Sequence, residues 1–256
     1  MSGYRLGTTS YILPDAILPN VRYLAPQVQD VELVLFEVDD GGGNLPSAEE
    51  VDQLAGLALQ HGLSYTVHLP LDLRLGSDGG DQHRSLQKAR AVIDRTRALD
   101  PWAYVLHLDG KDVRDHAAWV GQAARALELA AGWAGSAERL AVENLEGYPL
   151  DFIDPVLARL PAGRCLDIGH LWLEGYDPLP LLERHLERTR VIHLHGIGSR
   201  DHQSLAHIDR AELRRVLTAL EAGGYAGVVT LEVFGQEDFQ SSMAVLGELG
   251  VGSWAS

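Results

Sequence analysis

The chain alternates short apolar runs with longer stretches of helical spacing, and this alternation occurs eight times. The runs expected to form strands are residues 4–9, 31–37, 64–69, 103–109, 139–145, 164–169, 190–196 and 227–234. Strands that alternate with helices favour a parallel sheet, because a parallel pair needs a long crossover connection. Eight such units in 256 residues fit a closed barrel better than an open doubly wound sheet. The sequence therefore predicts a single (β/α)8 TIM-barrel domain over residues 1–256.

Two of the intervening stretches carry clear helix-boundary signals. Ser47 and Glu50 have the spacing of a capping box, and Gly62 stands where a helix of this length would end. Residues 210–224 repeat the plan, with an amphipathic run that stops at two glycines. Both stretches are predicted to be helices that follow strands.

Composition narrows the classes of partner. The net charge is -15, from 36 acidic and 21 basic residues, and this opposes non-specific binding to nucleic acid, which relies on Lys and Arg. The single cysteine, Cys165, cannot form an internal disulfide and is expected to be a buried small residue. The chain shows no secretory signal and no run of roughly 20 apolar residues. We expect a cytoplasmic protein that acts on a small molecule and binds neither nucleic acid nor membrane.

Ionisable side chains gather where the predicted strands end. In a barrel of this kind the active site is built at the C-terminal ends of the strands. The residues at or near these ends are Glu37, His68, His107, Glu143, Asp167, His193, His195 and Glu232. Four histidines and four carboxylates on one rim would repel one another or remain unpaired without a cation. Imidazole and carboxylate ligands suit Zn²⁺, Mn²⁺, Fe²⁺ or Co²⁺. The sequence therefore predicts a divalent metal site.

Further candidates lie just beyond the strand ends. His170 follows Asp167 by three residues, close enough for its ring to reach the same cavity. The loop after the seventh strand offers Asp201, His202 and His207. Aromatic residues in these loops could offer flat apolar contacts to a ligand, although packing of the loops is the favoured explanation for them: Trp172, Tyr148, Tyr176 and Phe234.

Taken together, these motifs resemble the xylose-isomerase-like, AP-endonuclease-family-2 barrel superfamily. They are "VHLP" at His68, "LHLD" at His107, "VENL" at Glu143, "LDIGH" at Asp167, "IHLHG" at His193, "RDHQSL" at His202 and "TLEVF" at Glu232. Within that superfamily, residues 6–37 with "ENLEG", "DIGHLWLEG" and "IHLHGIGSRDHQSL" are similar to the cobamide-remodelling phosphodiesterases. The resemblance implies hydrolysis of the nucleotide loop of a cobamide, which would leave a cobinamide-type product.

The resemblance also implies a ligand set. In the endonuclease branch one metal would be held by His68, His107 and Glu143, and a second by Glu143, Asp167, His193 and Glu232. A third metal in that branch uses the histidine after the strand-6 aspartate, here His170, and an Asp-x-His pair. This chain departs there, because Arg200 stands where the aspartate would align before His202. We therefore expect two metal ions, with His170 and His202 still among the candidate ligands.

The remaining roles are expectations from the same resemblance and from position. Glu37 could act as a general base or could orient a metal ligand, and Glu143 and Glu232 are the other candidate catalytic carboxylates. His195 stands where the endonuclease branch carries an uncharged amide, so we expect it to contact the substrate phosphate or to support a ligand. Arg200 and Trp172 are predicted to bind substrate.

Two other functions remain open on the sequence. In a sugar isomerase or epimerase, one divalent ion would be held by Glu143, Asp167, His193 and Glu232, and the two glutamates would move a proton at carbon. A non-catalytic binder would retain the barrel and a structural ion. A DNA-repair endonuclease is disfavoured by the acidic charge. The number of metal ions per chain separates the first alternative from a phosphodiesterase.

Overall fold

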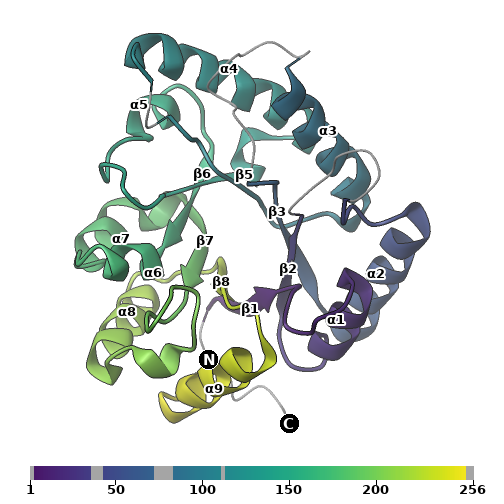
Figure 1. Ribbon diagram of the computed structural model, residues 1–256, viewed down its shortest axis with the longest axis vertical. Helices are drawn as coiled ribbons and strands as arrows, with labels where there is room; N and C mark the ends of the chain where they lie inside the picture. The colour runs from purple at the N-terminus through teal and green to yellow at the C-terminus, as the bar shows by residue number, and fades with distance from the viewer. Residues whose placement is uncertain (1–2, 36–42, 72–82, 111–112, 252–256) are drawn as a thin grey trace.

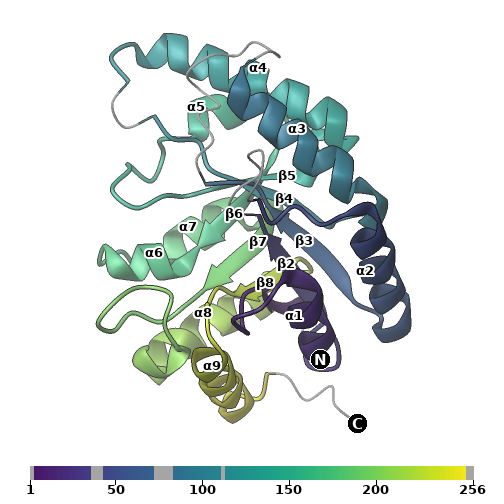
Figure 2. The ribbon, with the colours of Figure 1, turned by 45° about the vertical axis from the view of Figure 1, so that its right-hand side comes forward.

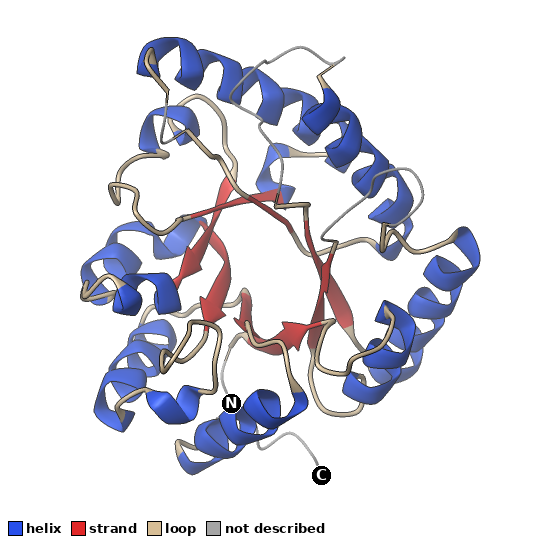
Figure 3. Ribbon diagram, viewed as in Figure 1, coloured by secondary structure: helices blue, strands red, loops and turns tan. Residues whose placement is uncertain are grey.

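The computed structural model describes residues 3–35, 43–71, 83–110 and 113–251. Over these residues eight parallel strands form a closed barrel in sequence order (Figures 1 and 3). The strands are β1 (Arg5–Thr9), β2 (Asp30–Val34), β3 (Ser64–His68), β4 (Tyr104–Leu106), β5 (Leu140–Glu143), β6 (Gly163–Asp167), β7 (Thr189–Leu194) and β8 (Val228–Leu231). The barrel closes where β1 pairs with β8, with Arg5 opposite Val228. The predicted TIM barrel is confirmed.

Helices surround the barrel and cover the outer faces of the strands (Figure 3). They are α1 (Ile17–Leu24), α2 (Ala48–His61), α3 (Arg84–Thr96), α4 (His116–Ala134), α5 (Asp154–Leu157), α6 (Ile168–Leu173), α7 (Leu179–His185), α8 (Arg210–Ala222) and α9 (Gln236–Glu248). Figure 2 shows α3 and α4 packed beside each other. No helix in the described ranges combines the length and apolar character that a membrane span needs.

The predicted helix boundaries are confirmed at α2 and α8. The Ser47 hydroxyl accepts the Glu50 N–H, and the Glu50 carboxylate accepts the Ser47 N–H, so both halves of the capping box form. Gly62 ends α2 with φ 66°, in the left-handed region that favours glycine. The amphipathic run at 210–224 forms α8, which ends at Ala222 before the two glycines.

Small side chains fill the barrel beneath the strand ends. Side chains alternate across a strand, so the residue two before a strand-end ligand shares its inward face. On β5, β6 and β7 these residues are Ala141, Cys165 and Val191, and all three are fully buried in one cluster. The expectation that Cys165 is a buried free thiol is confirmed. These apolar side chains form a layer inside the barrel directly beneath the polar strand ends.

Several strands are shorter than the apolar runs predicted. Each apolar run continues beyond the last residue of its strand because the first loop residues are themselves buried over the end of the barrel. These residues are Leu35, Leu69, Leu108 and Val233. β2 in particular ends at Val34 rather than at Glu37. Glu37, which was expected at or near the end of this strand, lies outside the described residues, so its role stays a prediction.

Candidate metal centre

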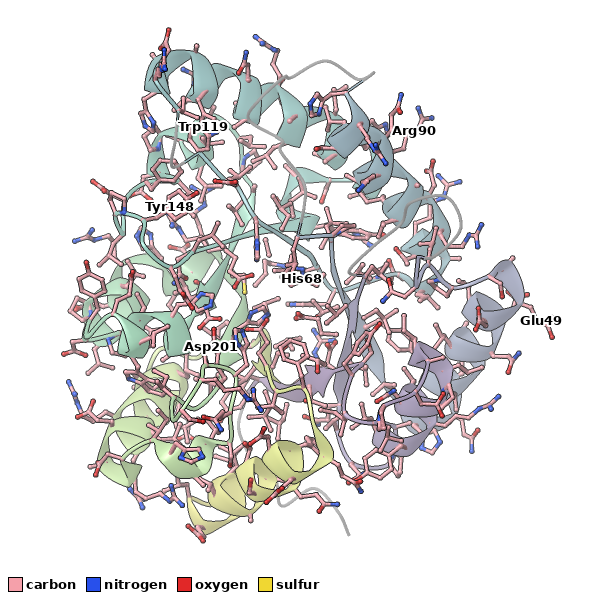
Figure 4. The ribbon with its side chains drawn as sticks, viewed as in Figure 1. Glu49, His68, Arg90, Trp119, Tyr148 and Asp201 are labelled. Atoms are coloured by element: carbon pink, nitrogen blue, oxygen red, sulfur yellow. The ribbon has the colours of Figure 1, made fainter. Side chains whose placement is uncertain are left out.

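Glu143, at the end of β5, joins two adjacent groups of metal-binding side chains. Its Oε2 atom lies 3.2 Å from Nε2 of His68 and 3.1 Å from Nε2 of His107. His68 projects toward the centre of the barrel (Figure 4), and its Nδ1 lies 2.8 Å from the Leu69 carbonyl. That carbonyl can only accept, so Nδ1 carries a proton, and Nε2 is the nitrogen whose lone pair a metal would take once its own proton is lost. His68, His107 and Glu143 thus present three ligand atoms to one point.

The second group surrounds His193 inside the barrel. Its Nδ1 atom lies 3.1 Å from Oε2 of Glu232, 3.6 Å from Oε1 of Glu143 and 3.7 Å from Oδ2 of Asp167. His193 Nδ1, Asp167 Oδ2 and Glu232 Oε2 are all buried without a hydrogen-bond partner. A buried polar atom left unsatisfied is costly, and a divalent cation would satisfy these atoms together. The donor set therefore fits a metal ion.

A third group contains Asp167, His170, His195 and His202, whose ligand atoms lie within 4.8 Å of one another. The His195 and His202 rings stack with centroids 4.2 Å apart. The backbone N–H of His202 lies 3.1 Å from Nδ1 of His195, and the Gly196 carbonyl oxygen lies 3.3 Å from the same nitrogen. The Nε2 atom of His195 lies 3.3 Å from Oδ1 of Asp167 and is buried without a hydrogen-bond partner. It is therefore one of the unsatisfied polar atoms of this group.

His195 has no exposed surface. Of the two roles predicted for it, support of a metal ligand fits this burial better than contact with a substrate phosphate. Its ring is held by a close approach to the backbone, since a Cβ atom at Gly169 would lie 2.2 Å from His195 Nε2. Only glycine leaves room for the ring there.

Local structure fixes Asp167. Asp167 is the N-cap of α6, and its Oδ1 accepts the His170 N–H over 2.7 Å. The Asn144 side chain accepts the Asp167 N–H at 2.8 Å and donates to the Asp167 carbonyl at 3.0 Å. These bonds hold the backbone of a candidate ligand carboxylate from both sides. The "LDIGH" motif therefore begins a helix and supplies two candidate metal ligands, Asp167 and His170.

Imidazole and carboxylate groups perturb one another's pKa values strongly. Burial alone would raise the pKa of Glu143, but His107 and His193 hold it well below its usual value. Burial would lower the pKa of His68, yet its bond to Glu143 raises that pKa to about 9. The pKa of His202 also rises to about 9, against its burial, because of Glu232. Protons hold the cluster together in the absence of metal, and a metal must displace them.

A cavity of about 310 Å³ opens at this end of the barrel. It is lined by Val34, His68, Leu71, His107, Glu143, His170, His202, Glu232 and Phe234. A larger groove of about 880 Å³ lies at the other end of the strands, between α7 and α8, and contains none of the predicted site residues. The metal-binding groups therefore open onto the smaller cavity.

Two residues predicted to bind substrate do not line this cavity. The Arg200 guanidinium lies 3.0 Å from Oδ2 of Asp238 and donates to the carbonyls of Asp201 and His202, so it holds the loop after β7. Trp172 packs against the hydrophobic core. Asp201 also supports His202, with Oδ2 3.2 Å from Nδ1 of that ring. The substrate roles of Arg200 and Trp172 stay predictions.

One residue of the site was missed by the sequence reasoning. Glu32 lies inside the barrel in the middle of β2, fully buried, with Oε2 3.0 Å from Nε2 of His193. The signal available in the sequence was a single glutamate within an apolar strand, since a charge in that position needs a partner. The partner is 161 positions away and no local pattern identifies it.

Comparison with solved structures shows the same fold in several enzymes. The structure of a D-tagatose 3-epimerase-like protein superposes with a TM-score of 0.76 at 18% identity, covering 95% of this chain and 96% of that one. Endonuclease IV from Thermus thermophilus gives a TM-score of 0.67 at 23% identity, covering 95% and 99%. For 3-keto-D-glucoside 4-epimerase from E. coli the values are 0.69 and 16%, covering 96% and 99%.

Comparison of the sequence with family models identifies the family. No curated protein matches the sequence. The family model described as "Xylose isomerase-like TIM barrel" matches residues 28–249, which include every candidate metal ligand. The chain therefore belongs to the AP endonuclease 2 family of xylose isomerase-like TIM barrels.

Proposed function

We propose that this protein is a metal-dependent phosphodiesterase that hydrolyses the nucleotide loop of cobamides. The observation that carries the proposal is the pair of ligand groups that meet at Glu143. One carboxylate oxygen faces His68 and His107, and the other faces His193. A single metal ion would need only one of these groups, whereas phosphodiester hydrolysis commonly uses two metals on either side of the reacting phosphate.

The candidate residues fall into metal ligands and groups that could hold a proton. His68, His107 and Glu143 would hold one ion, and Glu143, Asp167, His193 and Glu232 the other. Bound divalent metal supplies a water of lowered pKa and positive charge beside the phosphoryl oxygens. In the hydrolysis, phosphorus gains the water oxygen and loses an ester oxygen, which leaves with a proton. Glu232 and His202, 3.3 Å apart on the cavity wall, are placed to hold that proton, and Glu37 stays a candidate base.

The rim of the cavity favours a bulky, partly apolar substrate. Two exposed large hydrophobic side chains, Leu71 after β3 and Phe234 after β8, line the cavity together with Val34. Exposed apolar side chains beside a site mark ligand or partner surfaces. A corrinoid offers a broad apolar surface, whereas a free sugar would prefer polar walls. The sequence resemblance to cobamide-remodelling phosphodiesterases supports the same substrate.

A sugar epimerase or isomerase is the second candidate. It is favoured by the group Glu143, Asp167, His193 and Glu232, which suffices for one ion. The superposition with a D-tagatose 3-epimerase-like protein supports this candidate at the level of the fold. Under this function His68 and His107 would contact sugar hydroxyls instead of metal.

The test is incubation of the purified protein with a complete cobamide and each of Zn²⁺, Mn²⁺, Fe²⁺ and Co²⁺, followed by chromatography and mass analysis. We expect loss of the lower-ligand nucleoside, two metal ions per chain, and no turnover by Glu143→Gln. Glu248→Gln, outside the site, is the matched control and should retain activity. No cleavage with any metal would overturn the cobamide assignment. One ion per chain together with epimerisation of a ketose would establish the second candidate.

A further inference from the structure

Glu32 is a buried carboxylate that none of the predicted roles includes. It lies in the middle of β2, opposite Thr9 on one side and Thr66 on the other, with no exposed surface. Burying a lone carboxylate costs several kcal/mol, so such a group persists where a partner holds it. Among the described residues its ion pair is with His193, and Thr230 Oγ1 makes a longer contact of 3.4 Å.

The contact with Glu32 determines which nitrogen of His193 is free. Oε2 of Glu32 lies 3.0 Å from Nε2 of His193 and, as a carboxylate oxygen, can only accept. When Nδ1 binds a metal through its lone pair, the one remaining ring proton of His193 sits on Nε2, where the Glu32 carboxylate accepts it. The Nδ1 atom faces the carboxylates of Glu143, Asp167 and Glu232 and has no hydrogen-bond donor. In the other tautomer, the Nδ1 proton would block this position.

We infer that Glu32 is a positioning residue that holds His193 in the tautomer and ring orientation needed to bind a metal. The ligand is a divalent cation, and the contact follows the carboxylate–histidine–metal arrangement. Glu32 acts through His193, because its Oε2 contacts the imidazole; its Oε1 has no hydrogen-bond partner among the described residues. The inference requires a metal at His193 and holds whichever reaction the site catalyses, so its failure is distinguishable from that of the phosphodiesterase proposal.

The test replaces Glu32 by glutamine and measures metal affinity by competition with a coloured chelator, using Zn²⁺ and Co²⁺. Glutamine keeps the volume, but its amide can donate to His193 Nε2 and so favour the tautomer that blocks Nδ1. We expect affinity at the weakened site to fall by roughly 10- to 100-fold, the usual effect of removing such a partner. Nitrogen-15 NMR of the histidine rings should report loss of the Nε2–H tautomer at His193.

Asp30→Asn is the matched control. Asp30 lies two residues earlier on the same strand, is equally buried and bonds to Ser64 instead of a candidate ligand. It should leave metal affinity within about twofold, and a metal-free E32Q protein should remain folded by circular dichroism. A wild-type affinity in E32Q, with an unchanged His193 tautomer, would overturn the inference. Equal weakening in E32Q and D30N would also overturn it, because the effect would then come from disturbance of β2.

Discussion

Gly169→Ala is the sharpest test of how closely this site is packed. Gly169 lies in the first turn of α6, where alanine would ordinarily favour the helix by up to about 1 kcal/mol. Here, however, the added Cβ would lie 2.2, 2.3 and 2.4 Å from Nε2, Cε1 and Cδ2 of His195. The His195 ring has no exposed surface and stacks on His202, so it has little room to move away.

The magnitude follows from two alternatives. If the ring stays, the overpacking costs about 1–3 kcal/mol. If it moves, it gives up its stacking contact with His202, worth about 0.5–1.5 kcal/mol, and its 3.3 Å approach to the Asp167 carboxylate. Against the helix gain of up to about 1 kcal/mol, the net loss of stability is up to roughly 2 kcal/mol. For a chain of this size that is a fall of up to roughly 8 °C in the melting temperature.

Thermal unfolding followed by circular dichroism, in chelator and in excess metal, measures this effect. The matched control is Gly56→Ala on α2, where an added Cβ meets nothing within 4 Å. That variant should melt roughly 2–4 °C above wild type. If G169A melts as high as G56A, the close approach of His195 to the α6 backbone does not exist in solution, and the reasoning fails.

Three further predictions follow from the same contacts. Free Zn²⁺ at 100 times its Kd should stabilise the protein by about 2.7 kcal/mol over the chelated form, measured by melting; an unchanged melt would argue against a metal centre. Burial raises the pKa of Asp30 to about 6, above its value in the unfolded chain. The free energy of unfolding of the wild type therefore falls by roughly 3 kcal/mol as the pH rises from about 4 to about 6. Asp30→Asn should therefore gain roughly 3 kcal/mol relative to wild type over that range in urea titrations, whereas a pH-independent difference would contradict it. Arg200→Ala and Asp238→Asn should each lower the free energy of unfolding by less than about 1 kcal/mol and should change kcat/KM by the same factor. A larger fall in kcat/KM for R200A alone would indicate that Arg200 contacts substrate.

Much of the site could be predicted because of the fold's regularity. In a closed parallel barrel all strand ends meet at one rim, so residues such as His68 and Asp167, which follow apolar runs, must converge there. Strand alternation then places Glu143 and His193 inward without further information. The predicted residues His68, Glu143 and Asp167 do end their strands. At β2 the apolar run continues beyond the last strand residue, Val34, and Glu37 lies outside the described residues.

The sequence by itself determined the eightfold alternation, the caps of α2 and α8, and the order of the candidate ligands, because these depend on spacing over a few residues. Tertiary structure alone decided which groups face each other. It brought Glu32 to His193 and turned Arg200 toward Asp238. It also closed the backbone at Gly169 onto His195. Such pairings depend on barrel closure and loop paths, which set distances between residues far apart in the chain and leave no local pattern in the sequence.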